Sequence, residues 1–288
     1  MIKRILITGK NSYIGTSFEK WLAKYPEKYE VDTISLRDES WEEQDFSKYD
    51  VVYHVAGIAH RKETDENKEL YYKVNRDLAY EVAKKSKHDG VKQFIFLSTM
   101  SVYGLESGVI DDHTPLKPKS YYGTSKLQAE KLIKPLDDDS FKIAILRPPM
   151  VYGKGCKGNY PRLAKLAKII PIFPDIDNKR SMIYIDNLSE LVRLLIDDNG
   201  NGLFCPQNEE YVNTSEMVQL IAKANGKKIV MTKLFNPLLR LLNLTVINKV
   251  FGDLVYEKNI CKQVNNYRVC RFNESVFMTE KLEDKKVD

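Results

Sequence analysis

Short apolar runs recur through the first half of the chain, and the stretches between them have their apolar residues at helical spacing. Buried strands that alternate with helices indicate crossover connections, a parallel sheet and helices on both of its faces. The pattern therefore predicts an α/β fold with a doubly wound parallel sheet. The expected strands are 4–9 (RILITG), 31–36 (VDTISL), 51–57 (VVYHVAG), 93–98 (QFIFLS) and 142–148 (KIAILRP).

Two of the predicted helices have a clear buried face, because their apolar residues recur at i, i+3, i+4 and i+7 spacings. Both are expected to pack against the sheet, and Gly200 is expected to end the second one. The buried face of the first helix is Ile14, Phe18, Trp21 and Leu22, and that of the second is Leu188, Leu191, Val192 and Leu195.

From about Gly153 the character of the chain changes. The stretch GKGCKGNYPRLAKLAKIIPIFPD contains several glycines and prolines, and after Asn208 the periodicity is less regular. We expect a sheet domain formed by residues 1–155 and 183–205. Residues 156–182 and 206–288 are expected to form a smaller, substrate-covering domain.

Composition narrows the possible functions. A chain of 288 residues, 43% of them hydrophobic, can bury a sizeable core. Its net charge of +5 comes from lysines scattered among carboxylates, which argues against a nucleic-acid partner and suits a small anionic substrate.

The most apolar segment, Leu234–Leu244, contains Pro237 and Arg240 and is too short to span a bilayer, so we expect no membrane insertion. The N-terminus enters a strand without a secretory pattern, which predicts a cytoplasmic protein.

The chain has four cysteines, and they are far apart. Cys156, Cys205, Cys261 and Cys270 form no CxxC pair, which argues against a zinc site and against a disulfide framework. We therefore expect four reduced thiols and no bound metal.

The segment ILITGKNSYIGTSF, residues 5–18, has the form of a strand, a turn and a helix. A helix N-terminus offers free N–H groups and a partial positive charge, so glycines in such a turn let a pyrophosphate approach the backbone. Gly9 and Gly15 have the spacing of the first and last glycines of a three-glycine turn, but Ser12 stands where the middle one is expected. Its hydroxyl can donate to a phosphate, whereas its Cβ would push the pyrophosphate outward. A plain strand-to-helix turn remains the alternative at this point.

The residues after the second strand bear on the choice of dinucleotide. In NAD enzymes an acid about 20 residues beyond the turn binds the ribose 2′-hydroxyl. Here that position is Ser35, and Arg37 follows with a guanidinium that suits a 2′-phosphate. Asp38 is a competing acid. These charges favour NADP over NAD, and solvated loop charges remain the alternative for Arg37 and Asp38.

Tyr122 and Lys126, in SYYGTSKLQAEKL, are four residues apart on a predicted helix and so share a face. A phenol with a pKa near 10 is a poor base at neutral pH unless a nearby cation favours the phenolate. Lys126 can supply that charge. Taken alone, the pair also fits a surface tyrosine beside a lysine.

Seven segments occur together over roughly residues 1–225: TGKNSYIG, DVVYHVAGIAH, VNRDLAYEVAKKS, STMSVYG, YGTSK, RPPMVYG and RSMIYIDNL. In this order they resemble the extended short-chain dehydrogenase/reductase family, the nucleotide-sugar epimerases, dehydratases and reductases. The resemblance implies a Rossmann-like fold with a smaller C-terminal substrate-binding domain, NAD or NADP as cofactor and a nucleotide-sugar substrate. It also implies a homodimer formed through the helices that carry 75–86 and 122–132.

The resemblance implies a role for each matching residue. Tyr122 would be the catalytic acid/base, Lys126 its partner, and Thr99 the hydroxyl that bonds the reacting oxygen. Ser101, Asn159 and Arg180 would bind the substrate, the last two at its diphosphate, which a guanidinium suits. The implied cofactor-binding residues are Gly9, Asn11, Ser12, Tyr13, Ile14, Gly15, Ser35, Arg37, Ala56, Gly57, Asn75, Tyr122, Lys126 and Pro148.

Several reactions occur in that family. Its sugar 4,6-dehydratases have an Asp-Glu pair between Thr and Val of the STxxVYG segment, where this chain has Met100 and Ser101, so this subclass is not expected. Segments between residues 153 and 188 look like bacterial UDP-sugar 4-epimerases of surface-polysaccharide pathways. We therefore expect a UDP-hexose or UDP-N-acetylhexosamine 4-epimerase that works through a transient 4-keto sugar.

Two alternatives stay open. One is an NADPH-dependent reductase of a UDP- or dTDP-4-keto-6-deoxy sugar, which the residues at 35 and 37 favour. The other is a non-catalytic NAD(P)-binding sensor protein. Degenerate proteins of that kind typically lose the tyrosine or the lysine, and this chain has both.

Overall fold

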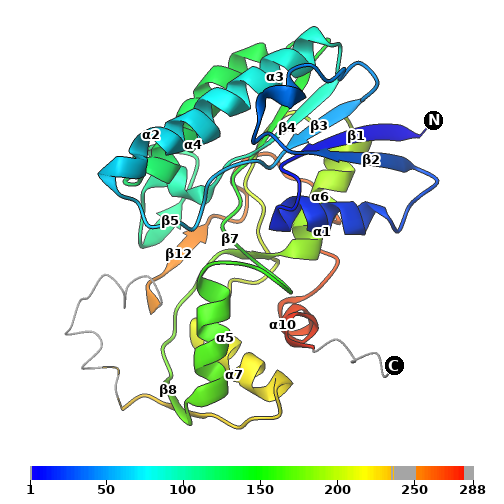
Figure 1. The fold of residues 1–288 in the computed structure, drawn as a ribbon. Coiled ribbons are helices and arrows are strands. Elements are labelled where there is room, and N and C mark those ends of the chain that lie inside the picture. The colour runs from blue at the N-terminus through cyan, green and yellow to red at the C-terminus, as the bar shows by residue number, and fades with distance from the viewer. Residues whose placement is uncertain (1, 235, 237–250, 282–288) are drawn as a thin grey trace.

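The computed structural model describes residues 2–234, 236 and 251–281 (Figure 1). Its centre is a six-stranded sheet in the order β10-β6-β4-β3-β1-β2, and all its strand pairs are parallel. The strand order reverses direction between β1 and β3, as in a doubly wound fold. The predicted fold class is therefore confirmed. The six strands are β1 (Lys3–Thr8), β2 (Tyr29–Ile34), β3 (Val51–His54), β4 (Gln93–Leu97), β6 (Lys142–Leu146) and β10 (Gly202–Phe204).

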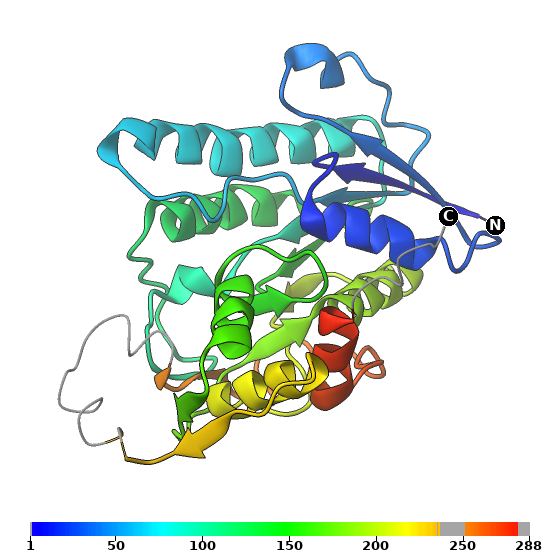
Figure 2. The same ribbon diagram turned by 60° about the horizontal axis from the view of Figure 1, so that its bottom comes forward.

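The central strands are buried on both faces because helices cover each side (Figures 1 and 2). Alternate residues of a strand point to opposite faces, so Ile5 and Ile7 join one core cluster and Leu6 joins the other. The first cluster lies under α1 (Tyr13–Leu22) and α6 (Ile185–Asp197). The second lies under α3 (Leu78–His88) and α4 (Tyr121–Ile133).

The predicted buried faces are confirmed. In α1, Phe18, Trp21 and Leu22 are buried and Ile14 is partly buried, and all four predicted residues of α6 are buried. The end of α6 differs from the prediction. The helix ends at Asp197, and the left-handed residue beyond it is Asn199 (φ 46°), whereas Gly200 donates its N–H to the Leu195 carbonyl at 2.8 Å.

The helix before β4 contains an irregular turn. Between α2 (Lys68–Tyr72) and α3 lies a π turn, η3 (Lys73–Asp77), which includes the buried Asn75. An inserted π turn often marks a functional site in a helix. The run from α2 to α3 lies beside α4 (Figure 1), so Asn75 faces the helix that carries Tyr122 and Lys126.

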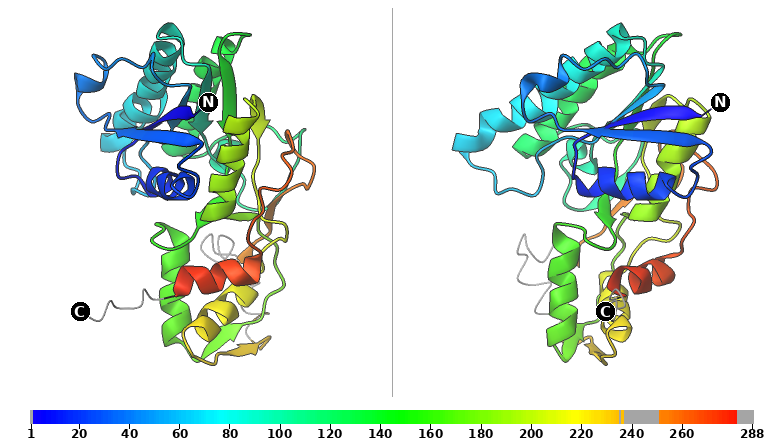
Figure 3. Two further views of the ribbon diagram at one scale, coloured as in Figure 1. Left: turned by 90° about the vertical axis from the view of Figure 1, so that its right-hand side faces the viewer. Right: turned by 45° about the vertical axis from the view of Figure 1, so that its right-hand side comes forward.

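A smaller part of the chain lies at one end of the sheet (Figure 3). Its helices share a third core cluster, which includes Tyr152, Tyr184 and Val218. The division at residues 156–182 and 206–288 stays a prediction, because β12 (Leu254–Tyr256) returns to pair with β5 (Gly108–Ile110) beside the larger part. The remaining elements are α5 (Asn159–Ile169), α7 (Thr214–Ala224), α10 (Phe272–Glu280), β7 (Met150–Tyr152), β8 (Ile172–Pro174), β9 (Met182–Tyr184), β11 (Val230–Thr232), η1 (Glu39–Trp41), η2 (Asp65–Asn67), η4 (Met100–Tyr103) and η5 (Lys134–Leu136).

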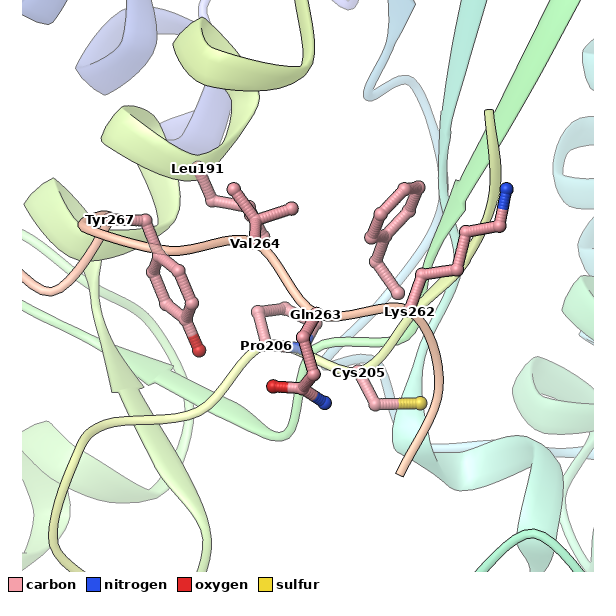
Figure 4. Close-up of a pocket in the computed structure, with 8 residues that line it drawn as sticks. Leu191, Cys205, Pro206, Lys262, Gln263, Val264 and Tyr267 are labelled. Carbon is pink, nitrogen blue, oxygen red and sulfur yellow. The ribbon is translucent and has the colours of Figure 1, made fainter. Parts of the chain in front are cut away.

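The prediction of four reduced cysteines is wrong. Cys205 and Cys261 form a disulfide across 56 residues of sequence, while Cys156 and Cys270 are free. Cys205, labelled in Figure 4, directly follows β10. Cys261 lies on the segment after β12, and the N–H of the next residue, Lys262, donates to the Leu203 carbonyl of β10 at 3.0 Å. Sequence spacing gave no sign of this pairing, because only the fold brings the two segments together.

Within the described residues, no helix combines the length and the apolar character needed to cross a membrane. Most of the predicted apolar segment Leu234–Leu244 lies outside the residues that the structure describes.

Candidate active site

The turn after β1 needs both of its glycines. Gly9 has φ +105°, and a Cβ added there would lie 2.9 Å from the backbone nitrogen of Ala56. A Cβ on Gly15 would lie 3.1 Å from Ile7 Cγ2 and 3.2 Å from Val55 Cγ2. The turn therefore packs tightly against the end of β3, and a side chain larger than that of glycine would collide there.

Ser12 is the N-cap of α1. Its Oγ accepts a hydrogen bond from Gly15 N at 3.2 Å, which satisfies one of the N–H groups that a helix N-terminus leaves free. The hydroxyl hydrogen of Ser12 takes no part in this bond. A serine at the position of the middle glycine thus caps the helix and still has a hydrogen to donate.

The competing charges after β2 differ in their surroundings. Asp38 caps η1, accepting hydrogen bonds from both the N–H and the hydroxyl of Ser40, and these bonds hold the pKa of its carboxyl below the usual value. Arg37 is exposed, and its backbone N–H donates to the Ser35 hydroxyl at 3.3 Å. Asp38 is therefore engaged by its own turn, whereas the Arg37 guanidinium faces solvent.

Tyr122, Lys126 and Thr99 come together at the carboxyl end of β4. Tyr122 and Lys126 lie one turn apart on α4, and Thr99 is the second residue after the strand. Burial raises the pKa of Tyr122, and a hydrogen bond with Thr99 acts in the opposite direction. The structure thus places the predicted acid/base beside the predicted hydroxyl.

Lys126 is a buried lysine, 3% exposed. Its Nζ donates to the Leu97 carbonyl at 2.8 Å and lies 4.7 Å from the centre of the Phe96 ring. Burial lowers its pKa to about 7, although the charge of Glu130 acts in the opposite direction. A lysine with this pKa can change its charge near neutral pH, as acid–base chemistry requires.

Asn75 joins the loop after β3 to α4. Its Oδ1 accepts from Ile58 N at 2.8 Å, and its Nδ2 donates to Ser125 Oγ at 3.2 Å. A Cβ on Gly57 would lie 2.9 Å from Asn75 Oδ1 and 3.3 Å from Lys126 Nζ. The structure therefore brings Gly57, Asn75 and Lys126 together, as the predicted site requires.

Residues 5–204 match the NAD dependent epimerase/dehydratase family. The chain belongs to this family. A UDP-glucose 4-epimerase of Vibrio cholerae is 34% identical over 259 residues, which cover 79% of this chain and 77% of the relative. An N-acetyl-alpha-D-glucosaminyl-diphospho-ditrans,octacis-undecaprenol 4-epimerase of Escherichia coli O157:H7 is 26% identical, over 80% and 74% of the two chains. Among solved structures, a UDP-glucuronic acid 4-epimerase from Bacillus cereus in complex with NAD has a TM-score of 0.66 at 25% identity, over 80% of this chain and 85% of that one.

The turn fits the nicotinamide dinucleotide that this family uses. Gly9 and Gly15, where a Cβ would clash with the backbone or the core, lie at the N-terminus of α1. A helix N-terminus favours the binding of a diphosphate. The family match and the solved structure in complex with NAD confirm the predicted cofactor class, NAD or NADP. In the described part of the chain, no group of three or more His, Cys, Asp and Glu residues is placed to hold a metal ion.

Sequence reasoning missed a buried network beneath this site. Glu130, one turn beyond Lys126 on α4, forms a bidentate ion pair with Arg147, whose side chain is 8% exposed. The Ser98 hydroxyl donates to Glu130, and Arg147 Nη1 donates to Tyr103 Oη at 2.9 Å. The network links three segments that carry predicted site residues. Ser98 precedes Thr99, Arg147 precedes Pro148, and Glu130 lies on α4 with Lys126. A glutamate in a helix and an arginine before two prolines gave no signal of this pairing.

Of the remaining predicted residues, Ser101 and Pro148 lie beside this centre, and Asn159 and Arg180 belong to other segments. Ser101 Oγ is 3.2 Å from Thr99 Oγ1, and the buried Pro148 accepts from Met100 N at 2.9 Å. Asn159 is exposed at the start of α5. Arg180 Nη1 donates to the Gly252 carbonyl at 2.7 Å, and burial lowers the pKa of its guanidinium. Within the described residues no hydrogen bond or ion pair joins Asn159 or Arg180 to Tyr122, so their substrate roles stay predictions.

Proposed function

We propose that this chain is an NAD(P)-dependent nucleotide-sugar 4-epimerase. The observation that carries the proposal is the grouping of Tyr122, Thr99 and Lys126 at the end of β4, where Lys126 also approaches Gly57, the neighbour of the Ala56 that packs on Gly9. Similarity to two 4-epimerases over most of the chain supports the same reaction. The proposed substrate is a UDP-hexose or a UDP-N-acetylhexosamine, used in polysaccharide biosynthesis.

The proposed roles follow from the contacts. Tyr122 takes the proton from the sugar 4-hydroxyl, and Thr99 bonds the same oxygen, because Thr99 lies close enough to the phenol to lower its pKa. Burial lowers the pKa of Lys126 to about 7, and in its protonated form Lys126 would favour the phenolate of Tyr122, one turn away on α4. The nicotinamide, when bound, supplies the group that accepts hydride from C4 and returns it. In the return step the sugar has rotated so that the opposite face of C4 receives the hydride, and Tyr122 gives the proton back to the 4-oxygen.

The residues beside Thr99 support epimerisation over 4,6-dehydration. Met100 and Ser101 begin η4, and neither side chain has a carboxyl group that could remove water across C5–C6 of the sugar.

One observation favours a second candidate function, an NADPH-dependent reductase of a 4-keto-6-deoxy sugar. Asp38 is engaged in capping η1, while Arg37 is exposed near Ser35. An exposed guanidinium suits the 2′-phosphate of NADP. We therefore propose NADP as the preferred dinucleotide, and a reductase exchanges NADPH at each turnover.

We also propose that the protein is a cytoplasmic homodimer. Helices α3 and α4 form an outer layer of the larger part (Figure 1), and Leu132 of α4 is 40% exposed. Pairing of this layer with a second copy would bury that side chain. Light scattering of the purified protein tests the dimer.

The decisive experiment incubates the protein with UDP-glucose, UDP-N-acetylglucosamine or polyprenyl-diphosphate-linked N-acetylglucosamine, without added cofactor. Interconversion with the 4-epimer supports the proposal and identifies the carrier. No interconversion, together with NADPH oxidation on a nucleotide-linked 4-keto-6-deoxy sugar, establishes the reductase. Tyr122→Phe is the control, and a biological output that this substitution leaves unchanged would favour a sensor protein.

A further inference from the structure

The N-terminus of α4 is closed by side chains. The first three N–H groups of a helix have no partner within the helix. Here Tyr121 N donates to Glu63 Oε2 at 2.8 Å, Tyr122 N donates to Glu63 Oε1 at 2.9 Å, and Gly123 N donates to Ser120 Oγ at 3.0 Å. One carboxylate therefore holds two consecutive backbone groups, and the second of them belongs to the proposed acid/base.

Glu63 comes from a different part of the fold, the loop after β3. This loop begins at the predicted cofactor contacts Ala56 and Gly57, and Asn75 holds its first half through Ile58. Beyond Glu63, Asp65 Oδ1 accepts from the Tyr121 hydroxyl at 2.6 Å. The loop is thus anchored on the first turn of α4 by two neighbouring carboxylates.

The carboxylate suits this position. An anion at a helix N-terminus interacts favourably with the helix dipole, and N–H groups that donate to a charged oxygen form stronger bonds than those between neutral partners. Glu63 is half-buried, so solvent competes less for these bonds than on an open surface. Because Glu63 occupies this helix end, the end is not available to the diphosphate of a substrate.

We propose that Glu63 is a positioning residue for Tyr122, an inference that rests on the proposed function. Two hydrogen bonds to one planar carboxylate fix both the position and the orientation of the first turn of α4. Tyr122 lies in that turn, and its hydroxyl must be placed beside Thr99. The rest of α4 is held independently, because Leu127, Ala129 and Ile133 are buried in the core. Loss of Glu63 therefore shifts the first turn without unfolding the helix.

The test compares Glu63→Ala, Glu63→Gln and the matched control Ser120→Ala in the full chain. Ser120→Ala removes a cap from the same turn but leaves Tyr122 N bonded. Misplacement by about 1 Å can cost about 100-fold in rate, so Glu63→Ala should lower kcat by about 30- to 100-fold with KM within about threefold of wild type. Glu63→Gln keeps one acceptor oxygen and should recover only part of that loss, because its NH2 group faces one of the two backbone donors. The Tm of Ser120→Ala should fall by about as much as that of Glu63→Ala, while its kcat stays within about threefold of wild type.

A second readout does not depend on activity. Hydrogen exchange of the amides in 120–124 should accelerate in Glu63→Ala, while the amides of 127–133 stay as protected as in wild type. If the wild type is inactive in every assay of the proposed function, that function fails, and the exchange result still decides whether Glu63 holds the turn. Unchanged exchange, a rise in KM at unchanged kcat, or equal losses of kcat in Glu63→Ala and Ser120→Ala would each overturn the proposal.

Discussion

The buried pair of Glu130 and Arg147 gives the sharpest stability prediction. Their side chains are 6% and 8% exposed, and Arg147 Nε lies 3.0 Å from Glu130 Oε1 while Nη2 lies 2.5 Å from Oε2. Burial by itself would lower the pKa of Arg147, but the hydrogen bonds and charge of Glu130 raise it above the usual value. Arginine does not give up its proton in proteins. Glu130→Gln therefore leaves a buried cation without a counter-charge.

Removing one partner of a buried pair costs about 3–5 kcal/mol. Glutamine keeps one acceptor for Arg147, so we expect a loss near the lower end, roughly 3 kcal/mol. Urea unfolding of wild type and variant measures this loss directly. Because Ser98 and Arg147 adjoin Thr99 and Pro148, kcat of the variant should fall as well.

The double variant Glu130→Leu with Arg147→Met is the control, since it removes both charges. It should cost less than the sum of the two single variants, because neither leaves an unpaired ion. A loss below about 1 kcal/mol in Glu130→Gln would refute the reasoning, since it would mean that water or another group already compensates Arg147.

Three further predictions follow from the site. Burial lowers the pKa of Lys126 from 10.5 to about 7, so above that value the unfolded chain binds more protons than the folded one, and stability rises with pH. Between neutral pH and about pH 9, the free energy of unfolding of the wild type should rise relative to that of Lys126→Met by up to about 1.4 kcal/mol per pH unit. Urea unfolding of both proteins at the two pH values measures this, and a difference that does not change with pH would contradict it. Gly9→Ala should cost about 1–3 kcal/mol more than Gly90→Ala, because both glycines have positive φ but only Gly9 would meet backbone atoms; chemical unfolding of both variants measures the difference. Arg37→Ser should weaken NADP binding about 10- to 100-fold and leave NAD binding unchanged in a fluorescence titration, and equal losses for both dinucleotides would exclude the proposed 2′-phosphate contact.

The sequence determined the sheet, the helices with clear buried faces and the family. Strand runs without polar alternation, such as 93–98, predict burial on both faces, and every residue of β4 is indeed buried. The i, i+4 spacing of Tyr122 and Lys126 predicts one helix face whatever the rest of the chain does. Such features depend on local spacing, which the sequence displays directly. Seven motifs in the family's order then identified the cofactor class.

Tertiary structure decided the contacts between segments that are distant in the sequence. The disulfide of Cys205 and Cys261, the pair of Glu130 and Arg147, and the cap of α4 by Glu63 join residues 56, 17 and 58 or more positions apart. A carboxylate or a thiol looks the same in the sequence whether it faces water or a partner. Its burial and the direction of its hydrogen bonds set its charge and its role, and those depend on how the elements pack.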